Sequence, residues 1–136
     1  MAKALESALC DMQGQLFELG LAAKYDSEVF VRTFMTSDIA NDLDADFNHL
    51  QWAGKEYILE RMQNEHADIL TKTNALGDKE TLYWMGYLYR FWHYLTGESS
   101  KAIYKQAPYQ TMQTVFYAYH TLSPEMAIER IKDSHN

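Results

Sequence analysis

The residues whose types and spacing come nearest to a known chemistry are four oxygen-bearing side chains that alternate along one segment: Asp42, Asp44, Asp46 and Asn48. A calcium loop has such alternating ligands, but it also needs a glycine at its sixth position and a bidentate glutamate at its twelfth. Phe47 and Ala53 occupy those positions. The sequence therefore predicts a solvated acidic turn that could belong to a partner-binding surface, and no calcium site.

Arg61 and His66 fit a second pattern, the loose Arg-x4-His spacing of HEPN-type ribonucleases. These ribonucleases are all-helical and often act as toxins, and their Arg and His face a shared cleft across a dimer. Glu60, Glu65 and Asp68 surround the pair here and would repel RNA. Arg and His at this spacing are also common on exposed helix faces, so ribonuclease activity is only an alternative function.

The third candidate is a strip on one face of the aromatic segment 81–95, made by Tyr83, Tyr87, Arg90 and Tyr94 at spacings of 4, 3 and 4. Tyrosine and arginine are frequent anchors of binding surfaces, so the strip could bind an anionic ligand or a partner protein. The structural interpretation, which we favour, pairs Arg90 with an acidic residue such as Glu56 or Glu60. That ion pair would hold the two halves of the chain together.

Other catalytic and metal-binding patterns are missing from the sequence. Cys10 is the only cysteine, and no basic neighbour would activate its thiol. Asp46 and His49 form the only acid-x-x-His pair, whereas a di-metal bundle needs two such pairs. There is no glycine-rich phosphate loop. We therefore predict no cofactor and no metal, and an enzyme is the less favoured class.

Charge and hydropathy narrow the class of protein further. Residues 1–68 carry 13 acids and 5 bases, a net charge of −8, whereas residues 69–136 carry 6 acids and 7 bases, a net charge of +1. The acidic half opposes nucleic-acid binding and suits a basic protein partner. No apolar run is long enough to span a membrane, and the N-terminus lacks the apolar block of a signal peptide. A cytoplasmic protein is expected.

Helical periodicity and capping residues predict an all-α fold. The expected helices cover residues 5–24, 27–35, 38–43, 50–65, 79–95, 100–106, 108–120 and 124–132. Whether 67–76 continues the fourth helix with a bend or begins a new turn is left open. We expect a single domain, 1–136, with its weakest joint at 71–78. It should be a compact irregular bundle of seven to eight helices around the central aromatic helix.

The aromatic helix itself should turn one apolar face to the core. Trp84, Leu88, Phe91 and Leu95 share that face on a helical wheel, with Trp92 and Met85 at its margins, and the tyrosine strip lies on a second face.

Several blocks resemble uncharacterised bacterial proteins. Residues 96–105, 115–122 and 125–131 resemble a short bacterial domain of unknown function, although Arg130 stands where an acid is usual. The blocks 35–38, 51–54, 84–87 and 94–100 are similar to longer bacterial proteins that end in that domain. The resemblance implies an operon beside an ADP-ribosyltransferase-like protein, an arrangement similar to toxin–antitoxin modules. It carries over no catalytic residue.

These observations lead to one principal hypothesis and two alternatives. The principal hypothesis is a non-enzymatic intracellular bacterial interaction protein, antitoxin-like or accessory, that binds a neighbouring protein such as the ADP-ribosyltransferase-like toxin. Its acidic surface, residues 38–68, would occlude the partner, with Tyr87, Arg90 and Tyr94 contributing. The alternatives are a HEPN-type ribonuclease using Arg61 and His66, and a small-ligand-binding helical protein. Neither nucleic acid nor membrane is an expected partner, and a homodimer is compatible with every hypothesis.

Overall fold

A computed structural model describes residues 2–45 and 49–135. Over these ranges the chain forms eight α-helices and one short 3-10 helix: α1 (Ala2–Ala22), α2 (Ser27–Met35), α3 (Asp38–Asp44), η1 (His49–Trp52), α4 (Lys55–Glu65), α5 (Lys79–Thr96), α6 (Ser100–Gln106), α7 (Tyr109–Tyr119) and α8 (Pro124–His135). The one β-type pairing among the described residues is an isolated antiparallel bridge between Tyr25 and Lys72. The predicted all-α class is confirmed.

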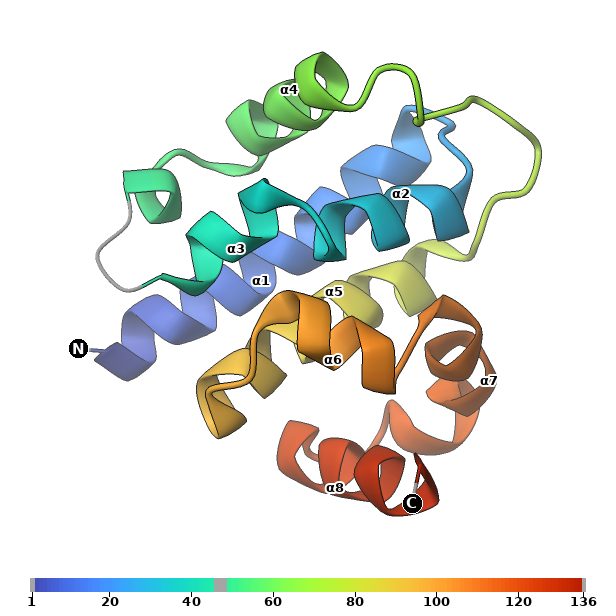
Figure 1. The fold of residues 1–136 in the computed structure, drawn as a ribbon. Helices are drawn as coiled ribbons and strands as arrows, with labels where there is room; N and C mark the ends of the chain where they lie inside the picture. The colour runs from blue at the N-terminus through green and yellow to red at the C-terminus, as the bar shows by residue number, and fades with distance from the viewer. Residues whose placement is uncertain (1, 46–48, 136) are drawn as a thin grey trace.

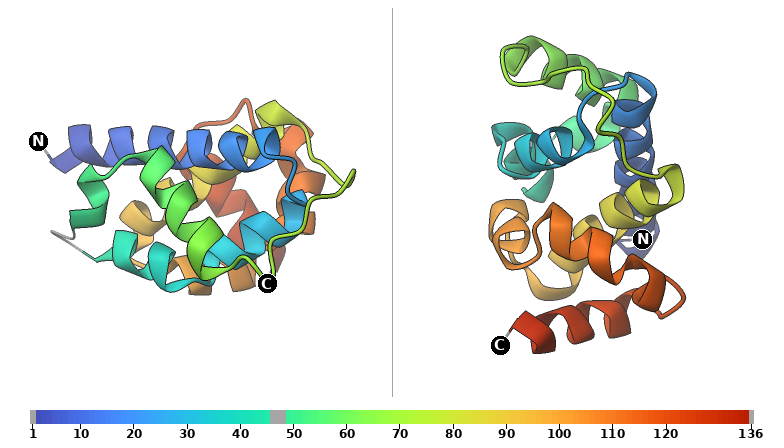
Figure 2. Two further views of the ribbon diagram at one scale, coloured as in Figure 1. Left: turned by 90° about the horizontal axis from the view of Figure 1, so that it is seen from above. Right: turned by 90° about the vertical axis from the view of Figure 1, so that its right-hand side faces the viewer.

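The helices are stacked in layers (Figure 1). Helix α4 lies at one end of the stack and α8 at the other, with α2 and α3 next to α4 (Figure 2). The long helix α1 packs along α5, and α5 also contacts α6, α7 and α8. The aromatic helix therefore lies at the centre of the bundle, as predicted.

The starts of four α-helices and the end of α5 follow from capping residues that the sequence shows. The side chains of Asp26, Ser37, Asp78 and Ser99 each accept a hydrogen bond from a backbone N–H in the first turn of α2, α3, α5 and α6. Gly97 ends α5 with a left-handed backbone, φ 77°. These local hydrogen bonds satisfy N–H groups that a helix end leaves free.

One predicted boundary is wrong, the start of the fourth helix. The expected single helix over 50–65 is divided into η1 and α4, because Gly54 takes φ 87° and starts α4 afresh. Segment 67–76, which the sequence left open, begins with a turn over 67–69 and contains no helix. Its backbone bonds instead to the α1–α2 turn: the Asp26 N–H donates to the Thr71 carbonyl at 2.8 Å, and the Thr73 N–H to the Lys24 carbonyl at 3.1 Å.

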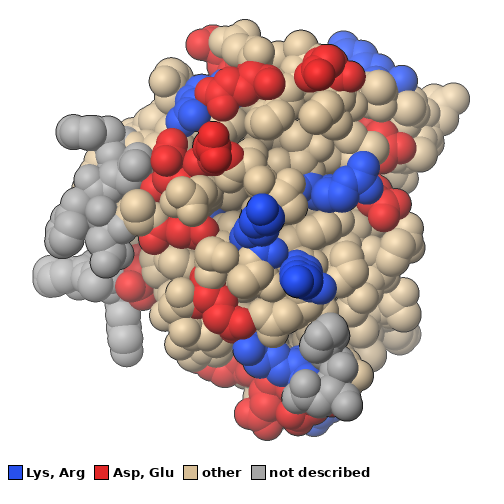
Figure 3. Space-filling view, in the orientation of Figure 1, with Lys and Arg blue, Asp and Glu red and all other residues tan. Residues whose placement is uncertain are grey.

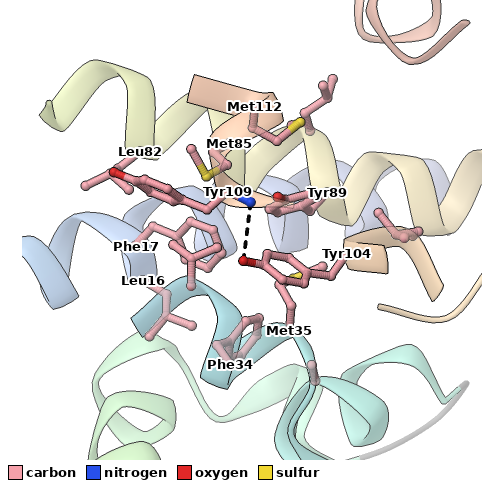
Figure 4. Close-up of a cluster of buried hydrophobic side chains, with 14 of the residues drawn as sticks. Leu16, Phe17, Phe34, Met35, Leu82, Met85, Tyr89, Tyr104, Tyr109 and Met112 are labelled. Carbon is pink, nitrogen blue, oxygen red and sulfur yellow. Dashed lines mark hydrogen bonds between the residues drawn. The ribbon is translucent and has the colours of Figure 1, made fainter. Parts of the chain in front are cut away.

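One hydrophobic cluster joins the two halves of the chain (Figure 4). Phe17 of α1 packs edge-on against Phe34 of α2 and Tyr89 of α5, with ring centroids 5.8 and 6.3 Å apart. Tyr104 accepts a hydrogen bond from the Tyr109 N–H at 3.2 Å, which draws α6 to the start of α7. None of the helices in the described ranges is long and apolar enough to cross a bilayer.

Two glycines bring α1 and α5 unusually close together. A Cβ built on Gly86 would lie 2.6 Å from the Gln13 carbonyl oxygen and 2.9 Å from the Gly14 Cα. A Cβ on Gly14 would lie 2.7 Å from the Tyr83 ring. The two backbones therefore touch at this crossing, which only residues without a side chain allow.

Glu98, in the loop between α5 and α6, fastens α8 to the bundle. Its carboxylate accepts hydrogen bonds from Trp92 Nε1 at 2.9 Å and from Gln106, and it pairs with Lys132 of α8 at 2.8 Å. Burial alone would raise the pKa of this carboxyl, but the bonds from Lys132, Trp92, Gln106 and Thr96 outweigh it and lower the pKa to about 2.

Replacing Gly86 with alanine should lower the free energy of unfolding by about 1–3 kcal/mol, because the new methyl group meets backbone atoms that cannot rotate away. Urea denaturation measures the effect. Gly97→Ala is the reference for backbone strain alone, since it adds the same methyl group into open space but at a left-handed position that costs about 1 kcal/mol. A Gly86→Ala protein as stable as the wild type would contradict the close helix crossing.

Glu98 should also make stability depend on acid. Its pKa is lower in the folded chain than the ordinary 4.5, so its contribution is complete above that value and disappears as the pH falls towards 2. The wild type should lose about 1–2 kcal/mol more than Glu98→Gln between pH 6 and pH 2, a figure reduced for solvent screening. Thermal melting across this range gives the comparison, and parallel pH curves would refute the assignment.

Candidate functional site

Arg90 is the centre of a buried polar network and is only 1% exposed. Its Nη1 donates to Asp44 Oδ1 at 2.7 Å, its Nε to Gln13 Oε1 at 2.8 Å and its Nη2 to Ser100 Oγ at 3.2 Å. These three partners come from α3, α1 and α6. The side chain therefore connects three helices to α5, as the structural interpretation of Arg90 expects.

Asp44 is shared between Arg90 and the first turn of α6. Its Oδ2 accepts from the Ser100 N–H and its Oδ1 from the Ser100 hydroxyl, both at 2.7 Å. His93 Nδ1 lies 3.7 Å from Asp44 Oδ1 and donates to the Glu98 carbonyl oxygen at 2.7 Å. A carboxylate in this position satisfies the guanidinium and favours the N-terminal end of α6.

Only part of the predicted acidic turn is therefore exposed at the surface. Asp44 is almost buried and paired, so assigning it to a solvated partner surface was wrong, and the acid that meets Arg90 is Asp44 rather than Glu56 or Glu60. Asp42 is partly exposed and pairs with Arg61 at 3.4 Å. Asp46 lies outside the described residues.

The four-residue strip on α5 is divided by the packing of α1. Arg90 points into the polar network, whereas Tyr83, Tyr87 and Tyr94 line surface hollows. The Tyr83 hydroxyl donates to the Asp11 carboxylate, and burial together with this bond raises the Tyr83 pKa well above its ordinary value. The three tyrosines thus line two hollows at the surface of α5, whereas Arg90 is buried in the polar network.

Tyr94 differs from the other two tyrosines. Its hydroxyl oxygen is buried and has no hydrogen-bond partner among the described residues. Burial is the main cause that raises its pKa to about 12, and the positive charge of Arg90 opposes the increase. The phenol is therefore neutral near pH 7.

Two neighbouring hollows meet at Tyr87. The first, about 370 Å³, lies between α5 and the α7–α8 region, and Tyr83, Trp84, Phe116 and His120 contribute rings to it. The second, about 380 Å³, lies between α1 and the C-terminal half of α5 and includes Phe91, Tyr94 and Leu95. The exposed margin of α5 is thus a run of aromatic and aliphatic side chains.

This margin corrects the predicted core face of α5. Leu88 is buried, but Trp84 and Phe91 are only partly buried and Leu95 is 49% exposed. The buried arc is instead centred on Leu82, Met85, Tyr89 and Trp92. Large aromatic rings are often incompletely buried, so hydrophobicity on a wheel misplaced the centre of the core face by about one third of a turn.

The acidic surface outside the network lies on α4 and α3. Helix α4 buries only Ile58 and Met62. Trp52 is 72% exposed and Tyr57 is 49% exposed. Figure 3 shows carboxylates gathered over α4 and α3, whereas Lys and Arg lie mainly across the middle of this face.

The two residues of the ribonuclease alternative belong to the same helix. Arg61 donates to Glu65 at 2.7 Å and to Asp42 at 3.4 Å, and these bonds raise its pKa, chiefly through Glu65. His66 follows the last turn of α4 as its C-cap. A guanidinium that two carboxylates already bind has little positive charge to offer a phosphate, so this alternative remains a prediction without structural support.

The described residues show neither a metal-binding cluster nor an activated thiol. No group of three or more His, Cys, Asp or Glu residues in the described ranges is placed to hold a metal ion. Cys10 is buried, and this burial raises its thiol pKa to about 12. The neutral, enclosed thiol is a poor nucleophile.

Sequence reasoning missed the other members of the network. Gln13 lies within the apolar stripe of α1, and its Nε2 donates to the Gly86 carbonyl oxygen at 3.0 Å. A lone glutamine in such a stripe, together with Gly14 beside it, was the available signal. Ser100 gave no such signal, because serine at the start of a helix is ordinary.

The chain was compared with protein-family models, with curated proteins and with solved structures, and none of the three comparisons found a match. A function must therefore be argued from the geometry described above.

Arg90→Met should destabilise the protein by about 3–5 kcal/mol, because it leaves the Asp44 carboxylate buried without its cation. Adding Asp44→Asn should recover part of this loss, since the uncompensated charge is then removed. Urea unfolding of both single variants and the double variant gives the coupling energy. If Arg90→Met were as stable as the wild type, the network would not be structural.

Proposed function

We propose that the protein is a non-enzymatic interaction protein that binds a basic partner protein through one surface, the α4 face. This face consists of side chains on η1 and the outer side of α4: Trp52, Glu56, Tyr57, Glu60 and Asn64. The observation that carries the proposal is the exposure of Trp52 beside that of Tyr57. Tryptophan and tyrosine are the commonest residues of binding hot spots.

The charge around these rings indicates the kind of partner. Glu56 and Glu60 are exposed, and the nearby Lys55 pairs with Glu56 at 3.3 Å. Arg61 is neutralised by Glu65 and Asp42. The α4 face therefore presents carboxylates with little competing positive charge, which suits a basic surface and speeds its association.

The packing of α4 also supports a binding role. The inner side of the helix is held by Ile58 and Met62, and the Arg61–Asp42 pair ties it to α3. Its outer side, with the adjoining η1, carries the exposed rings. A partner could cover this side without displacing the core of the bundle.

The candidate partner comes from the resemblance to uncharacterised bacterial proteins. An ADP-ribosyltransferase-like protein encoded beside this one would be the first to test, and binding at the α4 face would occlude a basic surface on it, as an antitoxin does. In this proposal Arg90 contributes only indirectly, by holding α3 in place beneath α4.

Trp52→Ala should weaken binding to the purified neighbouring protein by roughly 30-fold or more, the loss of a hot-spot side chain. Isothermal titration calorimetry measures it, and affinity should fall as salt rises. Tyr117→Ala is the matched control: Tyr117 is an 88% exposed aromatic residue on α7, at a distance from α4 (Figure 1).

Because Trp52 is so exposed, its loss should leave the melting temperature nearly unchanged, so weaker binding cannot be ascribed to unfolding. A neighbouring protein that does not bind at micromolar concentration would remove that partner. Equal affinity of the wild type and the Trp52→Ala, Tyr57→Ala double variant for any protein that does bind would refute the α4 face.

A further inference from the structure

The hollow between α5 and the α7–α8 region has the composition of a ligand site, and it lies apart from the α4 face. Five rings line it, from Tyr83, Trp84, Tyr87, Phe116 and His120. Leu88, Leu122 and Pro124 complete its apolar wall. Its volume of about 370 Å³ falls within the range of small-molecule sites.

The rings are held in place by contacts with one another and with α1. Trp84 meets Phe116 edge-on, with centroids 5.5 Å apart, and Phe116 stacks on His120 at 4.3 Å. The Tyr83 hydroxyl is bound to Asp11 of α1. The ring orientations are therefore already fixed, so binding a ligand would cost little conformational entropy.

The electrostatics of the hollow favour a positive ligand. Glu80 is the one charged residue among the described residues that line it. His120 Nδ1 donates to the Phe116 carbonyl oxygen at 2.8 Å, so in the neutral imidazole the other nitrogen, Nε2, is an acceptor. Aromatic faces attract cations through their quadrupoles. The hollow therefore combines one carboxylate with aromatic surface, and its described lining holds no Lys or Arg.

From this arrangement we propose that the hollow binds a small organic cation of the alkylammonium class, with its methyl or methylene groups against the rings and its charge balanced by Glu80. An anion would meet no Lys or Arg there. A purely apolar ligand would gain nothing from the exposed Glu80 carboxylate. The site is independent of the α4 face, so either proposal can fail without the other.

Choline and its neutral isostere dimethylbutanol, in which carbon replaces nitrogen, form a matched pair of probes. Trp84 fluorescence can report binding in the Trp52→Phe background. The remaining tryptophan, Trp92, is fully buried and out of reach of the ligand. Choline should bind with a Kd of about 1 mM and at least ten-fold more tightly than the isostere. Glu80→Gln should weaken choline binding roughly five-fold and leave the isostere unaffected.

Glu129→Gln, an exposed acid of α8 outside the hollow, is the control variant and should bind choline like the parent. Circular dichroism verifies that each variant is folded. Equal affinities for choline and dimethylbutanol would overturn the proposal, as would a choline Kd above roughly 10 mM or unchanged binding in Glu80→Gln. A trimethyllysine peptide that binds ten-fold more tightly than choline would overturn the small-molecule assignment in favour of a modified protein side chain.

Discussion

The contact between Gly14 and Gly86 is the constraint on which the rest of the structure depends. With no Cβ on either residue, α1 and α5 approach until their backbones touch. That closeness carries the Gln13 amide to the Gly86 carbonyl oxygen and the Gln13 side-chain oxygen to Arg90. A larger residue at either position would separate the helices, and the polar bonds that depend on this spacing would lengthen together.

Arg90 then decides where α3 and α6 can lie. A guanidinium in the core has a large desolvation cost, which only a complete set of acceptors can offset. Asp44 supplies the charge, and it reaches Arg90 only when the end of α3 meets the start of α6. A buried pair of this kind adds little net stability compared with an apolar core, but it disfavours every packing that leaves one of the charges alone. Its effect here is to select one arrangement of four helices.

Much of the fold could be predicted because local rules determine helix ends. Side-chain caps locate the starts of four helices and a left-handed glycine the end of α5, since each acts within one turn. Gly54 misled the prediction because a glycine inside a helical pattern is usually tolerated, and only its backbone φ shows that it restarts α4. Segment 67–76 was left open because its bonds go to the distant α1–α2 turn, which no local pattern reveals.

The candidate site was less predictable, because it depends on which neighbour covers each face of α5. A wheel separates apolar from polar residues, but α5 is covered on most of its circumference, and the ring-rich margin is the part left open. The charge of Arg90 pointed to a buried ion pair, yet its partner Asp44 looked like one member of an acidic turn. Only the contact of α3 with α6 distinguishes Asp44 from Asp42.

Helix α3 shows how the rigid and the exposed parts of the protein are joined. Asp44 turns inward to Arg90, whereas Asp42, half a turn earlier, turns outward to Arg61 of α4. The short helix α3 thus contributes Asp44 to the buried network and, through Asp42, also holds the peripheral helix α4. Because α4 is fixed from its inner side by Ile58, Met62 and this ion pair, its outer side chains make no contribution to the core. They can vary to suit a partner at little cost to folding, a freedom that the sealed interior around Arg90 does not have.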